Sequence, residues 1–297
     1  MENTKIRLDL KVAESKNISR SKAKELIINS FVEVNGNKIT KPSEYVDDSD
    51  VIGILSMNEK IFIPLQAMKK KIDIVYEDEY LLIVNKPSGL LTHPTNNDEN
   101  NTLANFLKYY FEQNNISSDF DMEDKRCGIC HRLDKNTAGL VIVAKSKKYF
   151  DEISKMIANK EVERLYLALV WKNLKTSVIK TDLPIKRLNG SNERIVSSNN
   201  DAKDSVTFFT ELERYNGFSL IECKLETGRT HQIRVHLKYI GNPIINDPIY
   251  GKDKNTTEYC QYLFANQISF IHPFTKKNVF VNLKTPKEFL NYIKDNG

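Results

Sequence analysis

One aspartate stands out among the residues that could do chemistry. Asp134 lies in a polar turn next to Arg132, and an uncharged apolar run at residues 140–144 follows at once. Such a run indicates a buried strand. A carboxylate fixed beside a buried strand can face a cleft, which suits a nucleophile or a general base. For any single aspartate in a turn, the alternative is a turn former that bonds its own backbone.

Two further blocks carry polar side chains that could complete a site. Tyr166 lies inside an apolar strand pattern at residues 165–170, and Arg164 directly precedes this pattern. A strand-borne aromatic ring can stack on a nucleobase and keep its hydroxyl for proton transfer. An arginine near Asp134 would hold that carboxylate ionised, lower its pKa and orient it. The third block lies between an expected strand and an expected helix and is densely polar: Arg229, His231, Gln232 and Arg234.

Each of these residues also has an ordinary structural explanation. Tyr166 fits a core position and Arg234 an ion pair, and His231 and His236 fit buried structural roles. The segment 127–131 matches the Cys-x-x-Cys-His pattern of haem attachment. Haem attachment requires export, and the N-terminal residues predict no signal peptide. A zinc site would need a second ligand pair, which the spacing does not provide, so we interpret the match as chance.

The elements that must position these blocks follow from hydrophobic patterning. The pattern favours strands at 81–84, 140–144, 165–170 and 218–225, and helices around 103–110 and 151–160. Proline and glycine predict a turn at 85–90, and polar composition predicts loops at 96–101, 114–124 and 189–204, the last of them mobile. Regular βαβ spacing and a Gly-rich dinucleotide turn are both missing. The sequence therefore predicts an α+β fold with a mainly antiparallel, mixed central sheet and a cleft.

The first 62 residues are expected to form a separate small α/β domain. We predict a linker at 63–72 and a catalytic domain at 73–297. Asn35-Gly36 between alternating residues predicts a tight hairpin, because both turn positions need positive φ. Ser19 can cap a helix whose exposed side is basic, with Arg20, Lys22 and Lys24.

The composition is that of an ordinary globular protein. Of 297 residues, 40% are hydrophobic and 28% charged, and the net charge of +5 mildly favours a polyanionic partner. Four cysteines fit a reducing compartment. No apolar stretch reaches the length of about 18 residues that spans a membrane. We expect a cytoplasmic monomer with no membrane partner.

The three blocks, in this order, resemble the signature motifs of the RluA family of RNA pseudouridine synthases over roughly residues 70–290. The resemblance implies that Asp134 is the catalytic aspartate and that Tyr166 is the active-site tyrosine that stacks under the target uracil. It also implies that Arg234 pairs with the aspartate and that Arg132 enters the RNA near the extruded nucleotide. Further candidate RNA contacts are Arg164, Arg229, His231 and Gln232. Other matching segments look structural: 85–90, 183–185, 241–244, Asp247 with Tyr250-Gly251, and 272–273.

Departures from the family pattern spare the aspartate, the tyrosine and the paired arginine. Ala138 stands where serine is frequent, Arg164 where lysine is usual, and Asn246 where glycine is common. Residues 1–60 resemble the alpha-L RNA-binding module, which is like that of ribosomal small-subunit protein 4. This resemblance implies that the basic helix face contacts RNA, with four candidate residues: Ser19, Arg20, Lys22 and Lys24. The whole chain looks most like the RluD type, which implies structured RNA, in particular large-subunit (23S-type) ribosomal RNA, as the partner.

The implied reaction detaches uracil from C1′ of its ribose, turns it and reattaches it through C5. Because no redox change and no phosphate transfer occur, we expect no cofactor and no metal. The target base must first be flipped out of folded RNA. Attack of Asp134 at C1′, attack at uracil C6 and abstraction of a ribose proton all remain open. Two other classes of function compete: a non-catalytic RNA-binding or ribosome-assembly factor, and an N-glycosylase.

Overall fold

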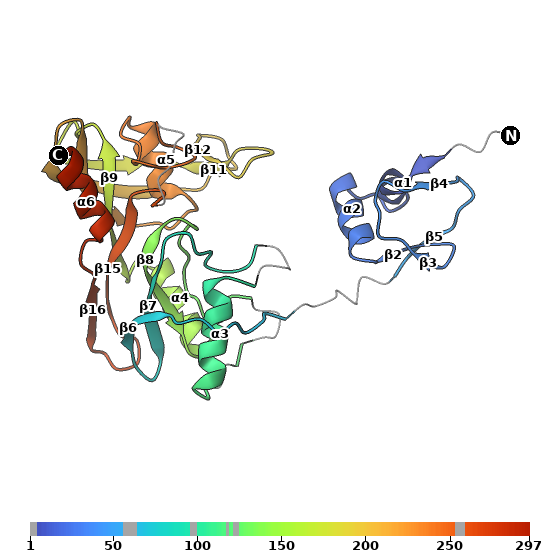
Figure 1. Ribbon diagram of the computed structural model, residues 1–297, viewed down its shortest axis with the longest axis horizontal. Helices are drawn as coiled ribbons and strands as arrows, with labels where there is room; N and C mark the ends of the chain where they lie inside the picture. The colour runs from blue at the N-terminus through green and yellow to red at the C-terminus, as the bar shows by residue number, and fades with distance from the viewer. Residues whose placement is uncertain (1–4, 56–63, 96–99, 117–118, 121–124, 253–258) are drawn as a thin grey trace. The chain divides into compact units, whose positions relative to one another are not determined.

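The computed structural model describes residues 5–55, 64–95, 100–116, 119–120, 125–252 and 259–297, and in this range it omits only the side chain of Lys22. The chain divides into two compact units, residues 1–63 and 64–297, which Figure 1 draws in blue and in cyan to red. The linker expected at 63–72 is therefore grouped mainly with the larger unit. Within the described residues, no helix is long and apolar enough to span a membrane.

The smaller unit packs two helices on short strands. The buried cluster of the unit joins Leu8, Val12, Ala23, Leu26, Ile27, Val32 and Val46. Asn35 and Gly36 both have positive φ, at 52° and 81°, which confirms the predicted hairpin. The elements of the smaller unit are β1 (Ile6–Arg7), α1 (Leu8–Ser15), α2 (Arg20–Ile28), β2 (Val32–Val34), β3 (Asn37–Lys38), β4 (Tyr45–Val46) and β5 (Ile52–Ile54). β1 pairs with β4, and β2 pairs with β3 and β5.

A nine-stranded sheet organises the described part of the larger unit. Its strands follow the order β10-β13-β14-β9-β15-β8-β7-β6, and β16 also pairs with β15. Every pairing is antiparallel except that of β15 with β8. The predicted mainly antiparallel, mixed sheet is confirmed. The strands are β6 (Asp73–Glu77), β7 (Leu81–Lys86), β8 (Ala138–Ala144), β9 (Glu163–Trp171), β10 (Val178–Asp182), β13 (Val206–Arg214), β14 (Phe218–Leu225), β15 (Leu263–Ile271) and β16 (Asn278–Asn282).

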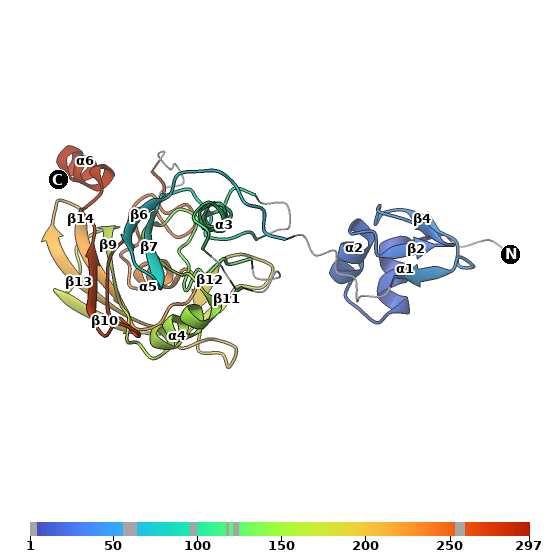
Figure 2. The same cartoon turned by 90° about the horizontal axis from the view of Figure 1, so that it is seen from below.

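Helices cover both faces of this sheet, because its central strands are apolar on both sides. Leu82 and Val84 of β7 belong to the cluster that includes α3 (Leu103–Gln113), whereas Leu81 and Ile83 pack with α4 (Lys147–Ala158). In Figure 2, β7 lies between these two helices. The remaining helices are α5 (Gln232–Tyr239) and α6 (Lys287–Asn296).

The parallel pair β8–β15 brings the Asp134 turn onto the middle of the sheet. Gly139 of β8 faces Ala265 of β15, and its φ is 116°. A Cβ atom at Gly139 would lie 2.2 Å from the Ala265 carbonyl oxygen. The approach of the two strands therefore requires glycine at this position.

One sequence-based expectation was wrong in part. Residues 189–204, expected to be a mobile loop, contain β12 (Arg194–Val196), which pairs with β11 (Ile185–Arg187). Val196 packs against a small cluster that includes Tyr250. The strand is set by this backbone pairing and packing, which local composition does not reveal. The loops expected at 96–101 and 114–124 lie partly outside the described residues.

Candidate active site

Asp134 begins a β-turn that the preceding segment of the chain holds in place. The Thr137 amide donates to the Asp134 carbonyl at 3.1 Å. Thr92 Oγ1 donates to the Leu133 carbonyl at 2.7 Å, and Ser88 Oγ donates to the Asn136 carbonyl at 2.9 Å. Because these hydrogen bonds hold the chain both before and after Asp134, they fix the Asp134 backbone relative to the sheet.

Lys86 is the most buried of these supports. Its ammonium donates to three carbonyls, those of Pro87, Leu90 and Lys135, at 2.9, 2.8 and 3.1 Å. Burial lowers the pKa of Lys86 to about 7, against the opposing effect of the Asp134 charge. The ammonium thus ties the 85–90 turn, predicted from sequence, to the residue that follows Asp134.

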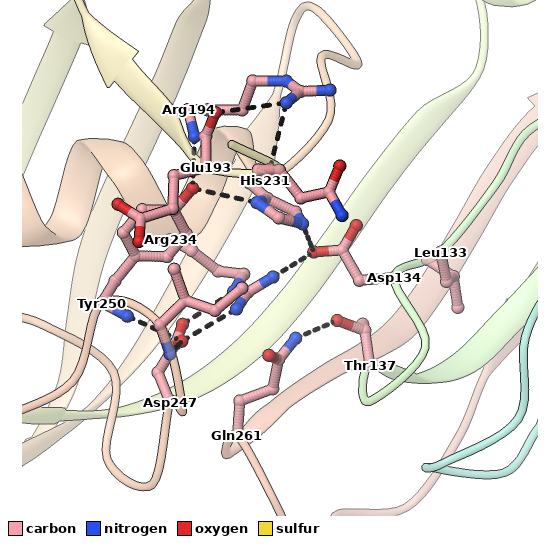
Figure 3. A network of polar contacts seen from close by, with 12 residues as sticks. Leu133, Asp134, Thr137, Glu193, Arg194, His231, Arg234, Asp247, Tyr250 and Gln261 are labelled. Carbon is pink, nitrogen blue, oxygen red and sulfur yellow. Dashed lines mark hydrogen bonds and ion pairs between the residues drawn. The ribbon is translucent and has the colours of Figure 1, made fainter. Parts of the chain in front are cut away.

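Arg234 of α5 lies between two carboxylates (Figure 3). Its Nη1 donates to Asp134 Oδ2 at 2.8 Å, while its Nε and Nη2 donate to the two oxygens of Asp247 at 2.7 and 2.8 Å. The side chain of Arg234 is only 3% exposed and that of Asp247 is fully buried, whereas Asp134 remains 16% exposed. The planar guanidinium is therefore fixed by Asp247 and presents one N–H to Asp134.

The charges of this group stabilise one another. Burial opposes ionisation of Asp247, but the bonds from Arg234 and from the amides of Ile249 and Tyr250 outweigh it, and its pKa lies below the usual value. The pKa of Arg234 is raised, because its two carboxylate partners outweigh burial. Arg234 stays cationic at every working pH, and one of its N–H groups lies 2.8 Å from the Asp134 carboxylate.

His231 adds a second polar side chain beside Asp134. Its Nε2 lies 3.7 Å from Asp134 Oδ2, and its Nδ1 lies 2.9 Å from the Tyr250 hydroxyl. That hydroxyl also accepts from the Arg194 amide at 2.7 Å. His231 has a left-handed backbone, φ 61°, at the start of α5, and burial lowers its pKa despite Asp134. A neutral imidazole whose Nδ1 accepts a hydrogen bond from the Tyr250 hydroxyl carries its proton on Nε2 and turns this N–H toward the carboxylate.

A cavity of about 470 Å³ joins all three sequence blocks. Asp134, Arg164, Tyr166 and Arg234 all line it. Arg164 and Tyr166 lie two residues apart on β9, so their side chains point to the same face. Tyr166 is 5% exposed, and burial raises the pKa of its hydroxyl. The neutral phenol ring therefore forms part of the wall beside the Asp134–Arg234 pair.

The other residues proposed to contact RNA from this cleft have different environments. Arg132 and Arg229 are exposed at the cavity wall. Gln232 is buried, and all of its hydrogen bonds stay within the protein, to Thr227, Arg229, Val206 and Thr207. Its amide braces the Arg229 turn, so we propose a positioning role for it. His236 is similarly enclosed, with its ring nitrogens on Thr207 Oγ1 and the Leu183 carbonyl.

In the smaller unit, three basic side chains gather on one carboxylate. Arg7 and Arg20 donate from Nε to the buried Asp9 at 3.1 and 3.0 Å, and Lys24 Nζ lies 3.9 Å from it. The bonds from Arg7 and Arg20, against desolvation, lower the pKa of Asp9 to about 2. Three cations around one anion leave this group with a net positive charge.

The two remaining candidates of this unit lie at the start of α2. The Ser19 carbonyl accepts the first helical bond from the Ala23 amide at 3.0 Å, so Ser19 occupies the predicted cap position. Lys22 is in the first turn of the helix, and its side chain lies outside the described atoms. Both stay proposals as RNA contacts.

Sequence reasoning did not assign a role in the site to Asp247, Lys86 or Tyr250. Each had been noted only within a segment that looked structural. The available signal was chemical: a charged or hydroxyl side chain inside an otherwise apolar neighbourhood needs a partner, and here each partner leads to Asp134.

Two family models match the chain. A model described as RNA pseudouridylate synthase matches residues 80–239, more than half of the chain, and an S4 domain model matches residues 6–52. An uncharacterized RNA pseudouridine synthase of Mycoplasma pneumoniae is 37% identical over 290 residues, which cover 95% of this chain and 90% of the relative. A ribosomal large subunit pseudouridine synthase D of Buchnera aphidicola is 33% identical, covering 93% and 90%.

A solved structure shows the same fold. Human RNA pseudouridylate synthase domain containing 4 has a TM-score of 0.59 and 22% identity, covering 75% of this chain and 92% of its own. These findings define the class of the protein, an isomerase that makes pseudouridine in RNA. The chain belongs to the RNA pseudouridylate synthase family and carries an N-terminal S4 domain, as its resemblance to RluA-family enzymes of the RluD type predicted.

Proposed function

We propose that this synthase acts on large-subunit ribosomal RNA, flips out the target uridine and uses Asp134 as its catalytic carboxylate. The observation that carries the assignment is the position of Asp134 in the cavity wall, partly exposed and fixed by Arg234 at 2.8 Å. Glu226 also lines the cavity, but it lies in an ion pair with Lys160 at 2.8 Å. Of these two carboxylates, Asp134 is the one held by a buried cation.

The geometry supports a division of labour around the base. A flipped uracil on the Tyr166 ring would have its ribose close to Asp134, whose ionised oxygen can attack carbon or take a proton. Arg234 Nη1, at 2.8 Å, fixes the direction of that oxygen. The Nε2–H of His231 can steady the same carboxylate without competing for its proton, since a neutral imidazole of this tautomer only donates there.

The target RNA is inferred from the relatives and the S4 domain. The Buchnera relative is named for the large ribosomal subunit, and the basic group around Asp9 gives the S4 domain a surface suited to RNA phosphates. A pseudouridine map of total RNA from cells with and without this protein tests the proposal. We expect sites in large-subunit ribosomal RNA to disappear with the protein. Losses confined to transfer RNA would contradict the target, and release of free uracil would indicate an N-glycosylase.

Tyr166 is expected to act mainly through its ring. Tyr166→Phe keeps the stacking surface, so we expect it to retain far more activity than Tyr166→Ala, which loses base stacking worth about 1–3 kcal/mol. Single-turnover rates on an RNA that carries the mapped uridine measure both variants. Equal inactivity of the two variants would show that the hydroxyl is essential and that stacking is the smaller role.

The S4 domain is expected to serve as a grip on RNA. Removing residues 1–62 should leave the larger unit folded, because it has its own core. Affinity for RNA should fall and its salt dependence should flatten, since fewer counterions are released. Binding titrations at several salt concentrations measure both effects. A truncated protein with the same affinity, salt slope and choice of site would contradict this role.

A further inference from the structure

Arg164 is a buried cation whose charge is not balanced by the described part of the protein. Its side chain lies in the cavity wall and the residue is 6% exposed. Among the described residues, no carboxylate lies within ion-pair distance of its guanidinium, and its Nε has no hydrogen-bond partner. The guanidinium instead packs against the backbone at Gly228, where a Cβ atom would lie 3.2 Å from Nη1.

The comparison with Arg234 shows how unusual this is. Arg234 is buried to a similar degree, but it shares three hydrogen bonds with two carboxylates. A buried charge without a partner costs folding free energy, and proteins keep such a group only where something compensates for it. No described residue compensates the charge of Arg164, whereas a bound anion would.

Groups near Arg164 cannot supply the missing negative charge. His131 accepts from the Ile142 amide on Nε2 at 3.1 Å, so its proton is on Nδ1, a buried nitrogen with no partner. Burial and the Arg164 charge lower the pKa of His131 to about 3, so this ring is neutral. Glu226, in the same cavity wall, is already paired with Lys160. Among the described residues, the nitrogens that lack a partner here are Arg164 Nε and His131 Nδ1, and both are N–H donors.

The position of Arg164 relative to Tyr166 identifies the ligand. The two residues are on one face of β9, about 7 Å apart. If a flipped base lies on the Tyr166 ring, Arg164 lies at the distance of the neighbouring nucleotide. The RNA backbone would enter or leave the cavity there. A phosphodiester brings one negative charge and two free oxygens, which match the planar fork of arginine. A uracil carbonyl would accept a bond and leave the charge unbalanced.

We infer that Arg164, with the Nδ1–H of His131 beside it, forms a subsite for a backbone phosphate that adjoins the flipped uridine. The inference rests on the proposed function, because it needs the base in the cavity. It gives the cavity two separate arginines, Arg234 for the carboxylate of the protein and Arg164 for the phosphate of the substrate. The ion pair between Arg164 and this phosphate would form as the correct nucleotide enters the cavity.

Neutral phosphates test this subsite by coupling. RNAs that carry the mapped uridine would have a single methylphosphonate linkage either 5′ or 3′ to it, and their binding to wild type and to Arg164→Met would be titrated. At one of the two positions we expect wild type to lose roughly tenfold to a hundredfold in affinity, the range for a bond to a charged group. For Arg164→Met, the methylphosphonate at that position should reduce the affinity little further, because the cation that binds the phosphate is already absent. Lys294→Met removes an exposed charge on α6 and should behave like wild type.

Stability without RNA gives a second, independent reading. Because Arg164 has no counter-ion in the described protein, Arg164→Met should unfold at the same temperature as wild type or higher. A drop of several degrees would overturn the inference, since it would reveal a partner within the fold. Equal losses for wild type and Arg164→Met at both linkages would also overturn it. These measurements use binding and unfolding, so the subsite can fail while wild type still forms pseudouridine, and the proposed function can fail separately.

Discussion

Asp134→Asn should abolish pseudouridine formation while RNA affinity stays within about tenfold, or roughly 1.4 kcal/mol. The amide has almost the same shape as the carboxylate, and its oxygen can still accept from Arg234 Nη1, which lies 2.8 Å away in the wild type. What is lost is the negative charge that attacks carbon or takes a proton. Pseudouridine analysis of RNA incubated with each protein, together with binding titrations, measures the two effects separately.

Glu226→Gln provides the matched control for this prediction. It removes the other carboxylate of the cavity wall, whose charge is paired with Lys160. We expect this variant to keep most of the wild-type rate, because its carboxylate has no link to Arg234. Appreciable turnover by Asp134→Asn, or an equal loss in both variants, would refute Asp134 as the catalytic carboxylate.

Much of the larger unit was predictable because its strands are locally distinctive. The runs at 81–84, 140–144 and 165–170 are apolar on both faces, and all three proved to be central strands of the sheet, β7, β8 and β9. Their order in the sheet was not predictable. The parallel contact of β8 with β15 joins residues more than a hundred positions apart, and no local pattern encodes it.

The candidate site shows the same division between local and distant information. Chemistry and family resemblance together singled out Asp134, Tyr166 and Arg234, and the structure brings all three to one cavity. The sequence could not separate Gln232, whose side chain bonds to neighbouring residues, from Arg164, whose side chain has no hydrogen bond among the described residues. Both are polar residues in a promising block, and only burial and partners distinguish them.

Arg234→Lys should lower the rate by on the order of a hundredfold or more, about 2.7 kcal/mol in activation free energy. Lysine keeps the positive charge, but one ammonium cannot reproduce a fork that bonds both oxygens of Asp247 and still reaches Asp134. Asp134 would then lose its fixed direction. Because Asp247 is buried, the variant should also lose about 3 kcal/mol of unfolding free energy.

The pH dependence of stability tests the ion pair between Asp247 and Arg234, which holds Arg234 in place beside Asp134. The pKa of Asp247 is lowered in the folded protein, so its contribution is fully present above its unfolded pKa of about 3.9 and is lost as the pH falls through the folded value. Arg234→Lys should therefore differ most from wild type in denaturant unfolding near neutral pH and least in strong acid.

Asp247→Asn is the matched control for the rate of Arg234→Lys. It removes the charge that fixes the guanidinium but leaves the bond of Arg234 to Asp134, so its rate should fall less than that of Arg234→Lys. A near wild-type rate for Arg234→Lys would show that charge alone suffices and that the fork does not aim Asp134.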